Sequence, residues 1–423
     1  MDSAILSEMI ETRRRLHQHP EEGWTEFETT WLVYNRLKAL GCESVLTGTR
    51  LINPDCVLGR SEALVEKAVN RAIAAGVPAE FIDEIEGYTG AAAVIDTGRP
   101  GPVLALRFDM DALCVEETTD PEHLPNKQGF CSQYAGLMHA CGHDFHITAG
   151  IGTAIWLQEH KDELCGTVRF FFQPGEESSL GAWKVLETTA LDSVTRVWGF
   201  HSDPTNLVNA IGIREGAVAA AVDRFVITIT GVGCHGAHPD DGVDPIPAAA
   251  AMVQAFQTIV TRNINPFHPT LISVTRLEAG NTWNVIPQTA QLEGTVRTMD
   301  RQDRSLFEKR LKAIAEQTAS AYGASAEVEW IPGPPAVCND AEMAAFAKET
   351  AEAEGFWTVP EEQSLGGDDF SFYMEKVPGC YIKIGIGKGA TIHQPTFQVD
   401  PAALMPAVRY LSRLLLRWGE ENA

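Results

Sequence analysis

The sequence predicts an α/β protein in which a smaller α+β domain is inserted into a larger α/β/α domain. In the first half of the chain, short apolar strands alternate with helical patterns, and the same pattern occurs again near the end. This alternation is typical of an open α/β sheet. The middle of the chain instead predicts the order strand, helix, strand, strand, helix, strand, which is a ferredoxin-like unit. We therefore expect a larger domain over 1–218 and 333–423 and a smaller one over 219–332.

Helices precede the predicted sheet. Residues 5–16 and about 25–40 carry apolar residues at helical spacing, and the second pattern stops before Gly41. Residues 52–87 contain a further helical pattern where a short connection would suffice. We interpret this stretch as a helical insertion.

The predicted strands of the larger domain lead into polar residues. Open α/β sheets bind ligands beyond the carboxyl ends of their strands, so these residues are candidates for a site. The strands are 91–96, 103–107 before Asp109, 167–172 before Glu176 and Glu177, 196–200 before His201, and 381–386.

The smaller domain is predicted from alternation and helical spacing. Its expected elements, in order, are a strand over 224–230, a helix over 244–262, strands over 271–277 and 289–297, a helix over 300–322 and a strand over 326–331.

Composition excludes several classes of protein. The 423 residues carry a net charge of −24, which disfavours nucleic acid and anionic membrane surfaces as partners. No apolar run approaches the roughly 18 residues that cross a bilayer, and the N-terminus lacks the order of a secretory signal. The nine cysteines are odd in number and scattered, so we expect reduced thiols and a cytoplasmic protein.

The densest group of metal-binding residue types lies over residues 139–146. Cys141 and His143 are separated by Gly142, which permits a tight turn. Thiolate, imidazole and carboxylate are the usual ligands of first-row metals, and the thiolate favours zinc or a similar ion. Taken alone, such a segment is more often a buried loop of hydrogen-bonded histidines than a metal site.

Three more segments supply candidates. Glu176 and Glu177 are adjacent, so one could bind a metal while the other acts as a general base. Taken alone, such a pair is more often part of an exposed acidic loop. His201 and His393 each stand alone, where histidine is more often structural. Their convergence at one sheet edge carries the argument. The five candidate ligands are suited to two metal ions. They are Cys141, His143, Glu177, His201 and His393.

The motifs at 109–113, 138–144, 172–177 and 284–287 resemble those of the two-metal peptidase and amidohydrolase family, which includes aminoacylases, carboxypeptidase G, hippurate hydrolases and auxin-conjugate hydrolases. The resemblance runs from residue 13 to residue 395. It implies a zinc-peptidase-like catalytic domain and a dimerisation, or lid, domain. The family often carries Ala where this chain has Gly175, and we expect Gly175 to loosen that loop.

A narrower resemblance is carried by the insertion and by residues 96–102 and 129–139. They are similar to the group that contains one of the two subunit types of p-aminobenzoyl-glutamate hydrolase. This implies cleavage of the amide between an aromatic acyl group and an amino acid, with p-aminobenzoyl-glutamate, giving p-aminobenzoate and glutamate, as the first expectation. Indole-3-acetyl-aspartate or another N-acyl amino acid is the alternative.

The resemblance also implies residue roles. Asp109 would orient a ligand histidine, Glu176 would be the general base, His235 would donate to the oxyanion in a neighbouring subunit, and Asn284 would contact substrate. His238 competes with His235, and turn chemistry is the alternative for both His235 and Asn284. The two divalent ions, Mn or Zn, would be held by Cys141, His143, Glu177, His201 and His393.

The implied partners are a small-molecule substrate and a second copy of the chain, paired through the lid domain; a homologous partner subunit is the alternative to a homodimer. Two other functions stay open. The chain could bind ligands without catalysis, although the presence of Glu176 argues against this, or it could be a cysteine hydrolase that uses Cys141.

Overall fold

The computed structural model describes residues 3–55, 59–178, 181–186 and 188–423. Residues 56–58, which belong to the predicted insertion, lie outside the described residues. The chain divides into two units. Unit 1 comprises Met1–Gly216, Cys338–Glu362 and Asp369–Ala423, and unit 2 comprises Ala217–Val337 and Gln363–Asp368. That these units serve as catalytic and dimerisation domains stays a prediction.

Unit 1 is built on an eight-stranded mixed sheet of order β1-β2-β4-β3-β5-β16-β6-β15. Strands β3 and β4, β3 and β5, and β5 and β16 pair in parallel. β3 and β5 are buried along almost their whole length, which requires cover on both faces of the sheet. The strands are β1 Ser44–Thr47, β2 Ala91–Asp96, β3 Val103–Asp109, β4 Thr167–Gln173, β5 Arg196–Asp203, β6 Ala210–Ile213, β15 Trp357–Pro360 and β16 Gly379–Gly385, with the short β7 Gly216–Ala219 and β14 Val337–Asn339 outside this sheet.

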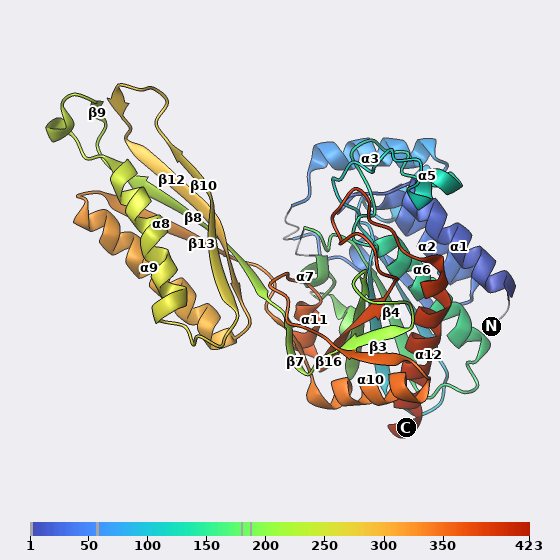
Figure 1. The fold of residues 1–423 in the computed structure, drawn as a ribbon. Helices are drawn as coiled ribbons and strands as arrows, with labels where there is room; N and C mark the ends of the chain where they lie inside the picture. Colours follow the sequence, from blue (N-terminus) through green and yellow to red (C-terminus); the bar gives the residue numbers. More distant parts are fainter. Residues whose placement is uncertain (1–2, 56–58, 179–180, 187) are drawn as a thin grey trace. The chain divides into compact units, whose positions relative to one another are not determined.

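The helix α6 (His143–Glu159) is the centre of unit 1. It is buried around most of its surface because it packs against the sheet and against α1 and α12 (Figure 1). Its N-terminus begins at the predicted metal-binding segment. The other helices are α1 Ser3–Gln18, α2 Phe27–Ala39, α3 Glu62–Ala74, α4 Ala79–Glu84, α5 Leu124–Gln128, α7 Gly181–Leu186, α10 Ala341–Ala353, α11 Ser371–Lys376 and α12 Leu404–Glu421, with 3₁₀ turns η1 Gly48–Arg50, η2 Thr189–Leu191 and η4 Pro401–Ala403.

Helices α3 and α4 lie in the stretch predicted as an insertion. They pack on α2 through a small apolar cluster that includes Phe27, Ala72 and Phe81. This cluster is separate from the main core. Arg71 of α3 also reaches Glu21, so the insertion contacts the segment before α2 through charge as well as apolar packing.

Unit 2 has the predicted strand and helix order. Its antiparallel sheet runs β10-β12-β8-β13, and α8 and α9 pack against it around a core that includes Phe225, Phe256 and Phe307. Its elements are β8 Ala221–Thr230, β9 Cys234–His235, η3 Pro239–Asp241, α8 Pro245–Arg262, β10 Thr270–Ala279, β11 Val285–Ile286, β12 Thr289–Thr298, α9 Arg301–Ala321 and β13 Ser325–Pro332. The predicted fold class is therefore confirmed. Among the described residues, no helix has the length and apolar character needed to cross a bilayer.

The position of His201 corrects one expectation about strand ends. The apolar pattern predicts that His201 lies just beyond a strand, but it lies inside β5. The reason is that β16 continues the parallel ladder, with Lys383 opposite His201 and Gly385 opposite Asp203.

A buried ionic network joins α1 to the start of α6. Arg13 Nε lies 3.1 Å from Asp144 Oδ2, and His17 Nδ1 lies 3.0 Å from the same oxygen. The other ring nitrogen of His17 lies 3.1 Å from Glu117 Oε1. Burial alone would lower the pKa of His17, but hydrogen bonds and charge from Asp144 and Glu117 outweigh it and raise the pKa.

We predict that His17 stabilises the protein in its protonated form. Because the folded-state pKa lies above the unfolded value of about 6.5, this contribution is fully present below pH 6.5 and is lost as the pH rises through the folded-state pKa. His17→Gln should therefore cost about 1.5–3 kcal/mol at pH 6 and less at pH 9, in urea unfolding of the metal-free protein. His160→Gln, which removes an exposed pair with Glu163, is the control and should change stability by less than about 0.5 kcal/mol. An equal loss from His17→Gln at both pH values would contradict the prediction.

Candidate active site

The Cys141–His143 turn sits at the N-terminus of α6 as the sequence predicts. Gly142 has a φ of 88°, and a Cβ there would lie 2.6 Å from Ser202 Oγ. Only glycine fits this turn, because it must both adopt a left-handed conformation and let the strand β5 approach. Ser202 Oγ donates to the Cys141 carbonyl at 3.0 Å, which holds the turn against β5.

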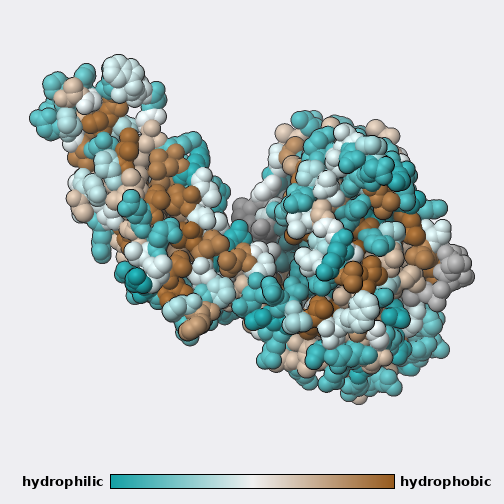
Figure 2. Space-filling view, in the orientation of Figure 1, coloured by the Kyte–Doolittle hydropathy of each residue, from teal (hydrophilic) through white to brown (hydrophobic). Residues whose placement is uncertain are grey.

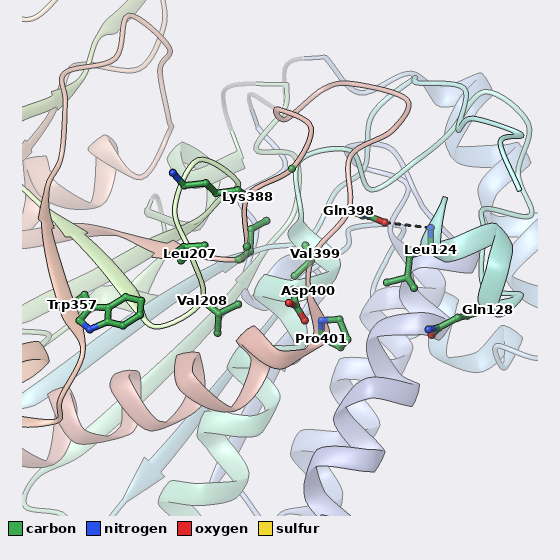
Figure 3. Close-up of a pocket in the computed structure, with 13 residues that line it drawn as sticks. Leu124, Gln128, Leu207, Val208, Trp357, Lys388, Gln398, Val399, Asp400 and Pro401 are labelled. Carbon is green, nitrogen blue, oxygen red and sulfur yellow. Dashed lines mark hydrogen bonds between the residues drawn. The ribbon is translucent and has the colours of Figure 1, made fainter. Parts of the chain in front are cut away.

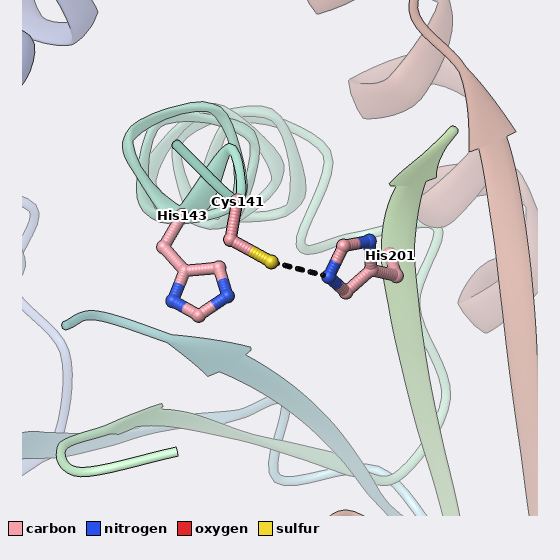
Figure 4. A group of neighbouring side chains, drawn as sticks. All are labelled: Cys141, His143 and His201. Carbon is pink, nitrogen blue, oxygen red and sulfur yellow. Dashed lines mark hydrogen bonds between the residues drawn. The ribbon is translucent and has the colours of Figure 1, made fainter. Parts of the chain in front are cut away.

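The side chains of Cys141, His143 and His201 converge (Figure 4). Their ligand atoms lie within 4.8 Å of one another, and Cys141 Sγ is 3.2 Å from His201 Nε2. His201 Nδ1 lies 2.8 Å from the Ser202 carbonyl, and His143 Nδ1 lies 2.8 Å from the Asp111 carbonyl. Because a carbonyl can only accept, each Nδ1 carries a proton, and in the neutral imidazole Nε2 is the nitrogen that can offer a lone pair to the cluster.

The Glu176–Glu177 pair comes from the loop after β4, residues 174–178, which we call the glutamate loop. The backbone N–H of Glu176 donates to Asp111 Oδ1 at 3.0 Å, and that of Glu177 donates to Asp111 Oδ2 at 2.8 Å. Glu177 joins a second group with Cys141 and His393, again with ligand atoms within 4.8 Å. Glu176 lies in a further group with Glu177 and His143. Both carboxylates thus reach the cluster from one loop.

Gly175 does not loosen this loop, contrary to expectation. It has a φ of 65°, and a Cβ there would lie 3.0 Å from Trp24 Cε2. The glycine therefore permits a left-handed turn that is packed tightly on the indole ring.

His393 lies on the loop between β16 and η4. Its backbone N–H donates to the Ala140 carbonyl at 2.8 Å, which ties this loop to the Cys141 turn. Its ring Nε2 is 3.6 Å from Glu177 Oε1, and its side chain is 49% exposed. The structure thus brings together all five residues predicted as ligands, and His393 is the most accessible of them.

Asp109 is the centre of a hydrogen-bond network next to the cluster. It accepts from Arg107 Nη1 at 2.7 Å and contacts His146 Nδ1, while His146 Nε2 accepts from the Ser202 backbone N–H at 2.9 Å. Burial would raise the pKa of Asp109, but the charges of His143 and Arg107 and the hydrogen bond from His146 hold it well below its usual range. Both nitrogens of His146 are thereby used, so this histidine serves the hydrogen-bond network around Asp109.

The cluster has the chemistry of a cation site. His143 Nε2 and Glu177 Oε1 are buried and have no hydrogen-bond partner among the described residues. Burial raises the pKa of Glu177 to about 7, although His143 opposes the shift. Such orphaned acceptors around a thiol are satisfied by divalent cations, so the residues present fit a metal.

The surroundings of Cys141 disfavour a free thiolate nucleophile. Burial, followed by the charges of Glu177, Glu176 and Asp109, raises the pKa of the thiol well above its ordinary value. Reactive cysteines need the opposite environment, in which cations lower the pKa. The cysteine-hydrolase alternative is therefore poorly supported by this geometry.

His235 and Asn284 lie together in unit 2, apart in the sequence but paired in space. The strands β9 and β11 place Val285 opposite His235, and the Gly236 N–H donates to the Asn284 carbonyl at 2.8 Å. His235 is exposed, and its ring lies 5.4 Å from that of His238. The two residues predicted to contact substrate thus share one short ribbon.

A cavity of about 770 Å³ lies elsewhere in unit 1 (Figure 3). None of the five candidate ligands is among the residues found to line it. Its lining residues are Leu124, Gln128, Leu207, Val208, Trp357, Ile386, Gly387, Lys388, Gly389, Gln398, Val399, Asp400 and Pro401.

Three supporting residues were not predicted from the sequence. Asp111 lies in the 109–113 motif but has no predicted role, although it binds two backbone N–H groups of the glutamate loop. His146 lies in the metal-binding segment and likewise has no predicted role. Arg107 is fully buried next to Asp109, and a charged residue inside an apolar strand was the available signal.

Several known proteins are similar to this chain over most of its length. The family model described as Peptidase family M20/M25/M40 matches residues 105–417. An N-acetylcysteine deacetylase of Bacillus subtilis (strain 168) is 39% identical over 413 residues, which cover 98% of this chain and 97% of that protein. A homolog of one p-aminobenzoyl-glutamate hydrolase subunit, from Haemophilus influenzae, is 32% identical over 426 residues, covering 97% and 98%.

A solved structure of a dinuclear metal binding peptidase of the M20 family from Bacillus subtilis is 37% identical, has a TM-score of 0.81 and covers 99% of both chains. The narrower resemblance is supported only in part, since the p-aminobenzoyl-glutamate relative is less similar than the deacetylase. Because the family model spans most of the chain and these relatives match nearly all of it, the chain belongs to peptidase family M20/M25/M40 and is a metal-dependent hydrolase.

Proposed function

We propose that the protein hydrolyses the amide bond of N-acyl amino acids with two divalent cations, Mn or Zn. The observation that carries this proposal is the convergence of ligand atoms from four separate segments, with Cys141 shared between two groups. The cations would be held by Cys141, His143, Glu177, His201 and His393.

Bound cations would polarise the amide carbonyl and lower the pKa of a water molecule. Glu176 would take the proton of the attacking water and pass it to the leaving nitrogen, which cannot depart as an anion. Its placement beside Glu177, on a backbone held by Asp111, supports this role. A protein that only bound ligands would have no use for such a positioned base.

We propose short N-acyl amino acids, with N-acetylcysteine first, as the substrates, because the deacetylase is the more similar relative. p-Aminobenzoyl-glutamate and indole-3-acetyl-aspartate are the alternatives that the sequence motifs suggested. His235 would donate to the oxyanion, a contact whose loss typically costs about 2.7–4 kcal/mol, and Asn284 would contact the substrate.

We also propose a homodimer formed through unit 2, with a homologous partner chain as the alternative. The strand β10 is an edge of the unit 2 sheet, and such edges favour pairing with another chain. Leu277 on β10 is 49% exposed, and Figure 2 shows apolar side chains gathered on the visible surface of this unit. Light scattering would measure the assembly.

Glu176→Gln is expected to lower kcat by about 10²–10⁴-fold, because the general base is lost. Metal content should be unchanged, since Glu176 is not one of the five proposed ligands. The measurements are amine release and elemental analysis of the metal-loaded protein. Glu342→Gln, on the surface of α10, is the matched control and should retain activity. Full activity in Glu176→Gln would remove Glu176 from the proposed chemistry.

Cys141→Ser is expected to lower metal affinity together with turnover, because a serine hydroxyl is a poor replacement for a thiolate ligand. Cys380→Ser changes another buried thiol and should leave metal content intact. Titration of the metal-free variants with zinc measures the difference. Lost turnover with unchanged metal content in Cys141→Ser would instead favour a cysteine hydrolase.

The substrate proposal is tested by assaying the metal-loaded protein with N-acetylcysteine, other acetyl amino acids, hippurate, p-aminobenzoyl-glutamate and indole-3-acetyl-aspartate. We expect the highest kcat/KM for acetylated amino acids, by about 10-fold or more, because differences in a binding pocket have effects of this size. Fastest release from p-aminobenzoyl-glutamate would reverse this order. No release from any compound, with metal bound, would favour a ligand-binding protein.

A further inference from the structure

The glutamate loop is held by a buried side chain from the N-terminal part of unit 1. The N–H of Gly175 donates to Glu26 Oε1 at 2.8 Å, and Thr89 Oγ1 donates to Glu26 Oε2 at 2.6 Å. Glu26 is fully buried. Its first hydrogen bond fixes the residue immediately before Glu176.

The same N-terminal segment packs directly against the loop. A Cβ on Gly23 would lie 3.2 Å from Gly175 Cα and 3.2 Å from Asp111 Oδ2. Trp24 is almost fully buried and has a left-handed φ of 68°, and its indole ring would lie 3.0 Å from a Cβ on Gly175. Segment 23–26 thus lies directly against the loop.

The segment is itself anchored. The Glu21 carboxylate accepts the backbone N–H groups of Glu28, at 3.1 Å, and Thr29, at 2.8 Å, at the start of α2. The Ala112 N–H donates to the Glu21 carbonyl at 2.7 Å. Arg71 of the insertion lies 3.2 Å from Glu21 Oε1. The segment that binds Gly175 is therefore held in place by contacts of Glu21 with α2, with Ala112 and with Arg71 of the insertion.

The position of Glu26 is costly for a carboxyl group. No salt bridge to it is formed by the residues that the structure describes, and burial, together with the charge of Asp111, raises the pKa of Glu26 to about 8. Two hydrogen bonds offset only part of the cost of removing a carboxyl group from water. Such a local conflict is expected where a site must be held in place.

We propose that Glu26 is a positioning residue for Glu176 and Glu177, acting through the backbone of Gly175. Its reach to the Gly175 N–H sets how far the loop extends toward Cys141, His143 and His393. The inference rests on the proposed function, which assigns the base and the ligand to this loop.

The test compares Glu26→Asp, which keeps the carboxylate but shortens its reach, with Glu26→Gln, which keeps the reach and one acceptor oxygen. Asn339→Ala is the matched control, because Asn339 is a buried side chain that binds the backbone of Arg214 and Tyr381 and has no part in the loop. Metal-free proteins are titrated with cobalt, whose visible absorption reports ligand geometry, and kcat and KM are measured after loading.

We expect Glu26→Asp to lower cobalt affinity and kcat by about 10–100-fold, as is typical of residues that orient metal ligands, with a changed cobalt spectrum and a smaller change in KM. The cobalt affinity and kcat of Glu26→Gln should stay within about threefold of the wild-type values, because glutamine keeps the side-chain length and an oxygen that can accept the Gly175 N–H. Asn339→Ala should lose stability but keep the wild-type spectrum. A folded Glu26→Asp with wild-type spectrum, affinity and kcat would overturn the proposal, as would an equal loss in Glu26→Gln.

If Glu26→Asp does not fold, Thr89→Val decides, because it removes the hydroxyl that donates to Glu26 Oε2 and leaves the hydrogen bonds between Asp111 and the loop in place. A changed cobalt spectrum in Thr89→Val would support the positioning role, and an unchanged one would overturn it. A wild-type protein that binds cobalt but releases no amine from any acyl amino acid would end the proposed function. The cobalt spectra of the variants would still decide the role of Glu26.

Discussion

One buried residue, Asp111, holds the parts of the site in register. Its side chain accepts the backbone N–H groups of both Glu176 and Glu177, and its own carbonyl lies 2.8 Å from His143 Nδ1. The end of β3, the loop after β4 and the start of α6 are thereby fixed to one another at a single point. The carbonyl contact also selects the tautomer of His143, so that its free nitrogen faces the cluster.

The fold follows from patterns that are local in the sequence. Apolar runs such as 167–172 and helical spacing such as 300–322 are decided by which face is buried, so their boundaries agree with the structure within a few residues. The strand that holds His201 was harder to delimit. Its last residues are polar, and only pairing with β16 keeps them in the sheet.

The site was predictable where residue type and spacing carry the chemistry, as at Cys141 and His143. It was not predictable where a role depends on contacts across the chain. Glu26 binds the N–H of Gly175, 149 residues away, and nothing near Glu26 in the sequence points to that partner. Arg107 and Asp109 are two residues apart, yet their significance comes from burial, which periodicity alone does not reveal. The identity of the acyl group is a similar case, because motifs that supply ligands and a base are independent of the residues that surround the substrate.

The concentration of acidic groups explains why a cation belongs in this site. Asp109, Asp111, Glu176, Glu177 and a buried thiol occupy one region, and the pKa values of Glu177 and Cys141 are both raised there. Burying like charges together destabilises a folded protein unless positive charge compensates for them. Arg107 and the protein's own histidines supply part of that charge, chiefly to Asp109. A divalent cation at the orphaned atoms of His143 and Glu177 would supply the rest, so metal binding and the stability of this part of the fold would be coupled. The arrangement that makes the site costly without a cation is therefore the same one that gives it affinity for a cation.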